Sequence, residues 1–240
     1  MRKEKIDAFV FIIFILLLSA GIYIGYSVHP VIASLPGQEG TKTNVLLPAV
    51  DERGNGVVVN MTVEVVPGSG KVLTDIDKIL FWVDTQDSIQ TAKHVAGKVL
   101  GIDKWNVDLI YSISSEEQGV VGGESAGAAI TIASIFALRN QTLPKDVAIT
   151  GTIDADGNIG IVGGIVQKAR AVRDAGAKLF LIPKENIESV WKAVENCTKQ
   201  DSRLFCEKRY VQQNITTVEG IEVVGVSNIY EALKYFNYTS

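Results

Sequence analysis

The sequence predicts a mixed α/β domain preceded by one transmembrane helix. Three patterns indicate this class. Residues 57–66 alternate apolar and polar side chains with the period of a strand, residues 88–100 repeat apolar side chains with the period of a helix, and residues 8–28 form an uncharged apolar run. We therefore expect a cytoplasmic N-terminus and membrane anchor over residues 1–30, a linker over 31–44, and one domain over 45–240.

The elements of this domain follow from periodicity and from the residues at their ends. Residues 57–66 predict a half-buried strand followed by the turn 67–70, and residues 105–113 predict a second strand. Ser88 is a possible cap for a helix over 88–100, which Gly101 ends. The apolar residues 126–138 predict a buried helix. A strand over 147–153, a tight turn over 154–158 and a helix over 165–175 follow. Helices over 187–195 and 228–236 flank a strand over 221–226.

The N-terminal segment has the charge pattern of a signal anchor. Residues 8–28 are 21 positions without a formal charge, which is long enough to cross a bilayer. Arg2, Lys3 and Lys5 precede the run, and no lysine or arginine follows until Lys42, so the domain is expected outside the cytoplasm. Cleavage of a signal peptide at the small-residue site 31–33 is the alternative, although the run is longer than a typical signal-peptide core.

Two further features agree with an exported domain. Asn-x-Thr glycosylation sequons occur at five positions: Asn60, Asn140, Asn196, Asn214 and Asn237. The two cysteines, Cys197 and Cys206, lie nine positions apart in a polar segment, which favours a local disulfide over a metal site in a chain with two histidines. Unmodified asparagines and free thiols are the alternatives.

Composition excludes several classes of function. The formal net charge is −4 and lysines and arginines do not cluster, so the chain lacks the electrostatic footprint of a nucleic-acid-binding protein. The spacing of glycines near residues 157–164 does not fit a dinucleotide site, and no Gly-x4-Gly-Lys-Ser/Thr motif occurs. We expect no metal, no cofactor and no dependence on ATP.

Ser125 is the candidate nucleophile. It lies among small residues in Gly122-Gly123-Glu124-Ser125-Ala126-Gly127, at the start of the predicted apolar helix. Backbone N–H groups at a helix N-terminus can stabilise the negative charge that develops on a carbonyl oxygen under attack. A serine that only caps this helix is the structural alternative.

Lys168 is the candidate general base. It follows Gly163-Gly164 on the first turns of the predicted helix over 165–175, beside Ile165, Val166 and Ala169. Loss of hydration among these residues would lower its pKa, so that the neutral amine could accept the serine proton. A solvated surface lysine is the alternative.

These segments together resemble the proteolytic domain of Lon proteases. The similarity is carried by residues 123–127, 146–151, 157–159, 163–164, Lys168 and 181–186, extends more weakly to 66–71 and 88–90, and spans about residues 45–187. It implies a fold like that of ribosomal protein S5 domain 2, a Ser125–Lys168 dyad, and a supporting hydrogen bond from Thr150 to the lysine. It also implies an oxyanion hole formed by backbone N–H groups of Gly123, Glu124 and Ser125, and a ring-shaped homo-oligomer.

The chain departs from this family at two positions beside the nucleophile. Glu124 replaces the proline that usually precedes the serine, and Gly122 stands where many members have an acidic residue. Both changes leave the dyad intact but bear on substrate preference and activation.

The sequence favours a membrane-anchored, ATP-independent Ser-Lys endopeptidase that acts on unfolded or flexible polypeptides outside the cytoplasm. One alternative is a noncatalytic peptide-binding or assembly module with the same fold. Another is a Ser-His hydrolase, which would have to use His94 because His29 adjoins the membrane segment.

Overall fold

The computed structural model describes residues 40–75, 79–81, 83–114, 119–121, 123–189, 191–200, 203–212, 217–218 and 220–238. Contacts separate the chain into residues 1–39 and 40–240, and the description that follows concerns the second unit. The predicted anchor over 8–28 lies outside the described residues. Within the described residues, no helix is both long enough and apolar enough to span a bilayer.

The first sheet has four strands in the order β1-β2-β5-β3, with only β3 and β5 parallel. Their bounds are β1 Thr41–Val50, β2 Gly56–Pro67, β3 Val72–Thr74 and β5 Val107–Ser114. The predicted strands over 57–66 and 105–113 correspond to β2 and β5.

The predicted linker ends earlier than expected, because β1 already pairs with β2 at Thr41 rather than beginning near Val45. The Thr43 side chain is buried, and its hydroxyl donates to the carbonyl of Gln141 at 3.0 Å. A buried β-branched residue with a bonded hydroxyl suits a strand, so residues 41–44 belong to the sheet.

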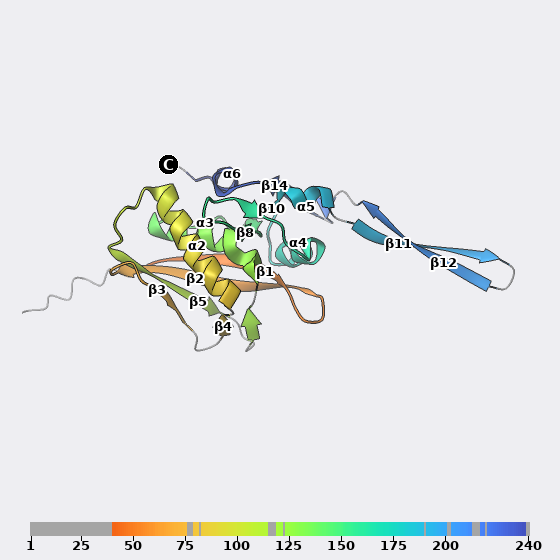
Figure 1. Cartoon of the computed structure of the whole chain (residues 1–240), viewed down its shortest axis with the longest axis horizontal. Coiled ribbons are helices and arrows are strands. Elements are labelled where there is room, and N and C mark those ends of the chain that lie inside the picture. The colour runs from red at the N-terminus through yellow and green to blue at the C-terminus, as the bar shows by residue number, and fades with distance from the viewer. Residues whose placement is uncertain are drawn as a thin grey trace, which may run out of the picture. The chain divides into compact units, whose positions relative to one another are not determined.

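Two helices, α2 and α3, pack against each other, and α3 also contacts strands β1 and β2 of the first sheet (Figure 1). Helix α2 spans Val83–Leu100, and a short 3₁₀ turn, η1 Glu124–Ala126, leads into α3, Gly127–Leu138. Helix α2 begins before the predicted cap. The Ser88 hydroxyl donates to the carbonyl of Asp84 at 3.0 Å inside the helix, so Ser88 is not the cap.

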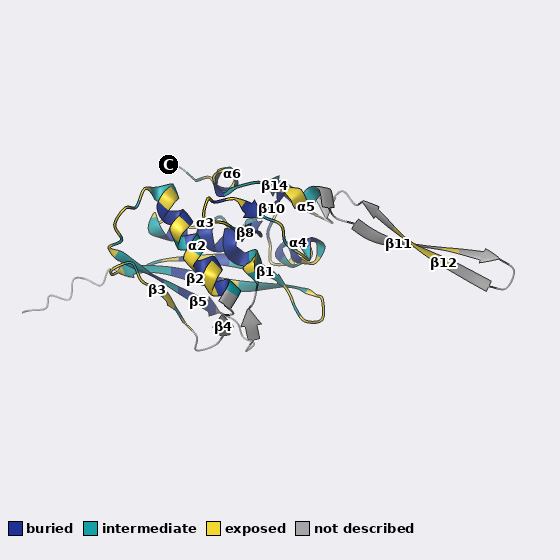
Figure 2. Ribbon diagram, viewed as in Figure 1, coloured by how far each residue is buried: buried dark blue, intermediate teal, exposed yellow. Residues whose placement is uncertain are grey.

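The predicted helix over 126–138 is confirmed. Every residue of α3 from Gly127 to Ala137 is buried, whereas α2 has one buried side and one exposed side (Figure 2). The apolar core formed with α3 includes Met61 and Val63 of β2 and Leu109 of β5. Helix α3 is thus a central element, so the 3₁₀ turn η1 that directly precedes it is held in a fixed place.

The second sheet has the order β13-β14-β10-β7, in which β14, β10 and β7 are parallel. Their bounds are β7 Val147–Ile149, β10 Leu179–Pro183, β13 Thr217–Val218 and β14 Ile221–Val226. Helix α4, Ile165–Asp174, packs on this sheet and encloses a second apolar cluster that includes Ala169, Val172 and Phe180.

The strand predicted over 147–153 is interrupted. After β7, residues Thr150 and Gly151 leave the sheet, and the antiparallel pair β8, Thr152–Ile153, and β9, Ile159–Gly160, follows. Thr150 keeps one bond to the sheet, from its N–H to the carbonyl of Leu181 at 3.0 Å. This interruption brings Thr150 to the serine, as the candidate site shows.

The C-terminal strand and helix agree with prediction. Strand β14 matches residues 221–226, and the predicted helix over 228–236 is formed by α6, Ile229–Leu233, and η2, Lys234–Phe236. Asn228 caps α6 by accepting from the N–H of Glu231 at 3.0 Å, and the Glu231 carboxylate accepts from the N–H of Ser227 at 2.9 Å. The first bond caps the N-terminus of α6, and the second ties the residue before the cap to the first turn of the helix.

The helix predicted over 187–195 is wrong in its second half. Helix α5 spans Lys184–Ser189, and Trp191 then begins strand β11, Trp191–Gln200, which pairs antiparallel with β12, Arg203–Gln212. Cys197 and Cys206 are direct cross-strand partners, and their sulfurs form a disulfide. The predicted cysteine pairing is therefore present, in a hairpin. A further parallel pair joins β4, Ile79–Phe81, and β6, Gly119–Val121.

Candidate active site

Ser125 lies in the 3₁₀ turn η1, immediately before the buried helix α3. The chain enters this turn through Gly123 at a φ of 110°, a conformation that a residue with a Cβ rarely adopts. The N-cap of η1 is Gly123 and that of α3 is Ala126, and neither makes a side-chain capping bond. The hydroxyl of Ser125 is therefore not used as a helix cap.

Close packing holds the serine turn against strand β8. A Cβ on Gly127 would lie 2.7 Å from Cγ2 of Ile153 and 3.1 Å from its backbone nitrogen. The N–H of Gly151 donates to the carbonyl of Ser125 at 3.0 Å, and the N–H of Ala128 donates to the carbonyl of Gly151 at 3.0 Å. Two backbone bonds thus fix the position of Ser125 relative to the segment between β7 and β8.

Lys168 reaches the serine from α4. The helix begins after Gly164, which adopts a left-handed conformation with φ 67° as the N-cap. The helix is amphipathic, and Lys168 lies on its buried side with Ile165, Ala169 and Val172. Only 4% of the lysine is exposed. Its Nζ lies 2.8 Å from Oγ of Ser125, so the two candidate residues are in direct hydrogen-bond contact.

Burial changes the proton affinity of this lysine. Loss of hydration disfavours the charged ammonium and lowers the pKa of Lys168 from 10.5 to about 8. At such a pKa, a substantial fraction of the chains carries a neutral amine slightly above neutral pH. A neutral amine at hydrogen-bond distance from a serine hydroxyl can accept its proton.

Thr150 connects the two residues. Its Oγ1 donates to the carbonyl of Ser125 at 3.0 Å, and Lys168 Nζ donates to the same Oγ1 at 3.4 Å. Since the single hydroxyl hydrogen is used by the serine carbonyl, Thr150 can only accept from the lysine. One N–H of the amine is therefore directed toward Thr150, which leaves the rest of the amine to face Ser125.

The backbone around the nucleophile offers donors for a developing oxyanion. Gly123, Glu124 and Ser125 lie at the start of η1, where N–H groups have no acceptor within the helix. Glu124 is exposed and Gly123 is half-buried. Gly122, the other departure from the family pattern, lies outside the described residues.

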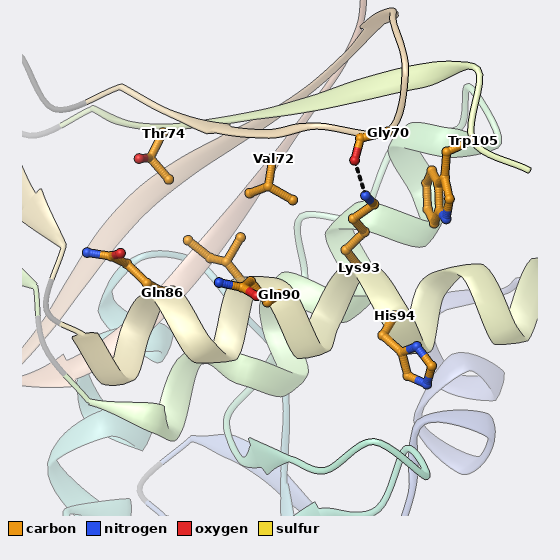
Figure 3. Close-up of a pocket in the computed structure, with 9 residues that line it drawn as sticks. Gly70, Val72, Thr74, Gln86, Gln90, Lys93, His94 and Trp105 are labelled. Carbon is orange, nitrogen blue, oxygen red and sulfur yellow. Dashed lines mark hydrogen bonds between the residues drawn. The ribbon is translucent and has the colours of Figure 1, made fainter.

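His94 belongs to a different part of the surface. It is an exposed residue of α2 and lines a hollow together with residues of β3, α2 and the segment near Trp105 (Figure 3). In the same hollow, Lys93 donates to the carbonyl of Gly70 and lies 4.6 Å from the centre of the Trp105 ring. The residue that contacts Ser125 Oγ is Lys168, so the geometry gives no support to a Ser-His pair.

Three of the sequon asparagines are exposed residues of the described domain. Asn60 lies in β2, whereas Asn140 and Asn237 adopt left-handed conformations with φ 54° and 52°. Asn196 lies in β11 opposite Glu207, and Asn214 lies outside the described residues. Modification of these side chains remains a prediction.

The roles of several contributors to the site were not predicted from the sequence. Gly127 and Gly151 allow the close approach of the serine turn to β8 and β9, and Asn186 binds the backbone of the segment that leads to Lys168. Small residues inside apolar stretches were the available signal for the two glycines. Asn186 was part of the family pattern, but the sequence did not indicate what its side chain binds.

Comparison with known proteins agrees with this geometry. Residues 117–215, which include Ser125, Thr150 and Lys168, match the family described as the Lon protease (S16) C-terminal proteolytic domain. Over these residues the chain is similar to a Lon proteolytic domain. The predicted resemblance is thereby confirmed, and the mixed α/β architecture is consistent with such a domain.

The curated relatives of the chain are longer proteins. The chain is 37% identical over 110 residues to the archaeal Lon protease of Methanocaldococcus jannaschii, covering 44% of this chain and 17% of that protein. It is 28% identical over 205 residues to the archaeal Lon protease of Archaeoglobus fulgidus, covering 83% of this chain and 28% of that protein. It is also 39% identical over 74 residues to the Lon protease of Haemophilus influenzae, covering 31% of this chain and 9% of that protein. The chain thus matches less than a third of the length of these relatives.

Proposed function

We propose that the chain is a membrane-anchored, ATP-independent serine endopeptidase with a Ser125–Lys168 dyad, acting on unfolded or flexible polypeptides outside the cytoplasm. The observation that carries this proposal is the 2.8 Å contact between Lys168 Nζ and Ser125 Oγ at a lysine that is 4% exposed. The finer assignment of the fold to the ribosomal protein S5 domain 2 type, preceded by a transmembrane helix, belongs to the same proposal.

The first half of the reaction forms an acyl-enzyme. Neutral Lys168 accepts the hydroxyl proton of Ser125 while Oγ attacks the carbonyl carbon of the substrate peptide bond. The carbonyl oxygen becomes negative and is stabilised by N–H groups of Gly123, Glu124 and Ser125. Lys168 then donates its proton to the leaving amine as the C–N bond breaks.

The second half releases the new C-terminus. A water molecule gives a proton to the now neutral Lys168 and attacks the ester carbonyl carbon, and Ser125 Oγ leaves and recovers the proton from the lysine. The amine thus acts as base and acid in turn. Thr150 keeps the ammonium directed toward the serine by accepting one of its hydrogens.

Location and assembly rest on the sequence. The run over 8–28, the basic residues before it and the five sequons support an anchor with the domain on the outer side. No Gly-x4-Gly-Lys-Ser/Thr motif for ATP binding occurs in the 240 residues, which supports hydrolysis without ATP. A ring-shaped homo-oligomer is expected from the family.

The test uses the full-length chain in detergent with an unfolded protein substrate and no nucleotide. We expect the parent to cleave the substrate. Ser125→Ala and Lys168→Ala should each reduce the rate by more than about 1,000-fold, as removal of a nucleophile or its base does in serine proteases. Ser69→Ala and Lys98→Ala, which replace exposed residues of the same types, are the matched controls and should cleave normally.

The noncatalytic alternative gives a different result in the same experiment. A peptide-binding module would retain the unfolded protein without cleaving it, and Ser125→Ala would leave this binding unchanged. Cleavage by Ser125→Ala at the parental rate would contradict the proposed nucleophile.

A further inference from the structure

The side chain of Asn186 binds both polar groups of one backbone residue near the site. Its Oδ1 accepts from the N–H of Val162 at 3.0 Å, and its Nδ2 donates to the carbonyl of Val162 at 3.0 Å. Asn186 is the third residue of α5 and is only 7% exposed. A buried carboxamide that forms two bonds with one residue acts like a neighbouring strand, so it fixes the position of Val162.

Val162 lies directly before the turn that starts the lysine-bearing helix. Gly163 and the N-cap Gly164 follow it, and the Gly164 carbonyl accepts from the N–H of Lys168 at 2.9 Å. On its other side this turn is confined by β1, because a Cβ on Gly164 would lie 2.5 Å from Cγ2 of Val50. Movement of Val162 would therefore move the first turn of α4 and the lysine with it.

Strand β10, which leads into the helix that carries Asn186, also supports Thr150. Helix α5 directly follows β10, and the carbonyl of Leu181 in β10 accepts from the N–H of Thr150. Strand β10 thus places the threonine directly, while Asn186 places the lysine through Val162. Among the described residues, the hydroxyls of Ser125 and Thr150 are bonded to Lys168 Nζ, and no carboxylate is.

We infer that Asn186 is a positioning residue of the hydrolytic reaction: through Val162 it holds the N-terminal turn of α4, and so holds Lys168 Nζ against Ser125 Oγ. This inference rests on the proposed function. Loss of the two hydrogen bonds between Asn186 and Val162 would allow the N-terminal turn of α4 to move and would admit water to the Lys168 amine. Both effects lower the rate of the chemical step, since a displacement of about 1 Å at a catalytic group can cost roughly 100-fold.

The test compares the parent, Asn186→Ala and Asn186→Asp as full-length chains in detergent. The Asp variant is isosteric and keeps the oxygen that accepts from Val162 N–H, but it places a second oxygen against the Val162 carbonyl. Asn228→Ala is the matched control. It removes the side-chain cap of α6 and should lower the stability of the chain without touching α4.

The main readout is reaction of Ser125 with an alkyl fluorophosphonate, in which Oγ bonds to phosphorus, fluoride leaves and Lys168 takes the hydroxyl proton. The rate is measured against pH and divided by the folded fraction from near-ultraviolet circular dichroism. We expect both Asn186 variants to react roughly 10- to 100-fold more slowly than the parent, with a midpoint at higher pH as the amine gains hydration. The Asn228 control should keep the parental rate and midpoint.

The outcomes separate the two proposals. A parent that neither reacts nor cleaves substrate overturns the proposed function and the positioning role together. A reactive parent, with Asn186 variants that match the rate and midpoint of the Asn228 control, overturns only the positioning role. Because Asn186→Asp preserves the size of the side chain, it provides this comparison even when Asn186→Ala fails to fold.

Discussion

At the scale of single residues, the buried lysine links activity to stability. Burial lowers the pKa of Lys168 from 10.5 to about 8, so at neutral pH the folded chain mostly holds a buried charge. The unfolded chain keeps its proton up to about pH 10.4, the usual range of a solvated lysine. Between these two values the unfolded state binds more protons, and stability rises with pH.

Replacing the lysine by an apolar residue should therefore stabilise the protein while abolishing hydrolysis. We expect Lys168→Met to raise the free energy of unfolding at pH 7 by up to roughly 3 kcal/mol, the equivalent of the pKa shift. The gain should shrink as pH rises from 8 to 10.5, where the parent recovers stability. Urea unfolding at several pH values measures this, and a gain that did not change with pH would contradict the stated cause.

The rate of hydrolysis should increase with pH as Lys168 loses its proton. Because neutral Lys168 is the active form in the proposed mechanism, kcat/KM is expected to rise about tenfold per pH unit below a midpoint near 8 and to level off above it. The measurement is initial rate of cleavage of an unfolded protein from pH 6 to 10. A flat profile over this range would show that another group limits the reaction.

At the scale of elements, two glycines of the site differ in the room around them. A Cβ on Gly127 would press into Ile153, whereas a Cβ on Gly163 would meet nothing within 4 Å. Gly127 is already helical with φ −54°, so an alanine there tests packing rather than backbone strain.

We expect Gly127→Ala to displace the serine turn from β8. Overpacking of this kind costs about 1–3 kcal/mol of stability, and the displacement should slow cleavage roughly 10- to 100-fold. Gly163→Ala, the matched control, should behave like the parent in both assays. Equal effects of the two substitutions on the cleavage rate would rule out the contact with Ile153 as the cause.

Elements with strong local periodicity were predictable, and those defined by distant partners were not. Helix α3 and strands β2 and β14 follow from residue patterns alone. Strand β11 was predicted as part of a helix, because its identity depends on pairing with β12 and on the Cys197–Cys206 disulfide. The break after β7 was missed because Thr150 leaves the sheet to bond with Ser125 and Lys168, residues far away in the sequence.

The candidate site was predictable as a set of residues but not as a geometry. Spacing and neighbours indicated Ser125 and Lys168, and the resemblance to Lon proteolytic domains indicated Thr150, while the 2.8 Å contact and the depth of burial follow from the tertiary fold. The role of Asn186 depends on a contact with Val162, 24 positions away, which no local pattern encodes.

At the scale of the whole molecule, the disulfide hairpin and the domain core are expected to be separable in stability. The disulfide closes a short loop between β11 and β12. Replacing both cysteines by serine should lower the free energy of unfolding of the hairpin by roughly 2–3 kcal/mol. Hydrogen exchange should increase in β11 and β12 and stay unchanged in α3, with the reaction of Ser125 unaffected. Slower reaction of Ser125 would show that the hairpin supports the site.

The anchor gives a second prediction at this scale. The full-length chain should stay with membranes through washes with high salt and carbonate and be released by detergent if residues 8–28 span the bilayer as proposed. Deleting residues 1–39 should release the chain without detergent. Release of the full-length chain by salt alone would contradict a spanning segment.

The position of the β11–β12 hairpin in the chain has a consequence for evolution and engineering. The hairpin interrupts the crossover between β10 and β14, which are adjacent parallel strands of one sheet. Lengthening a crossover raises the entropic cost of closure only slowly, by about 0.6 kcal/mol per doubling. We therefore expect that a foreign module could replace the β11–β12 hairpin at this junction without changing the rest of the domain.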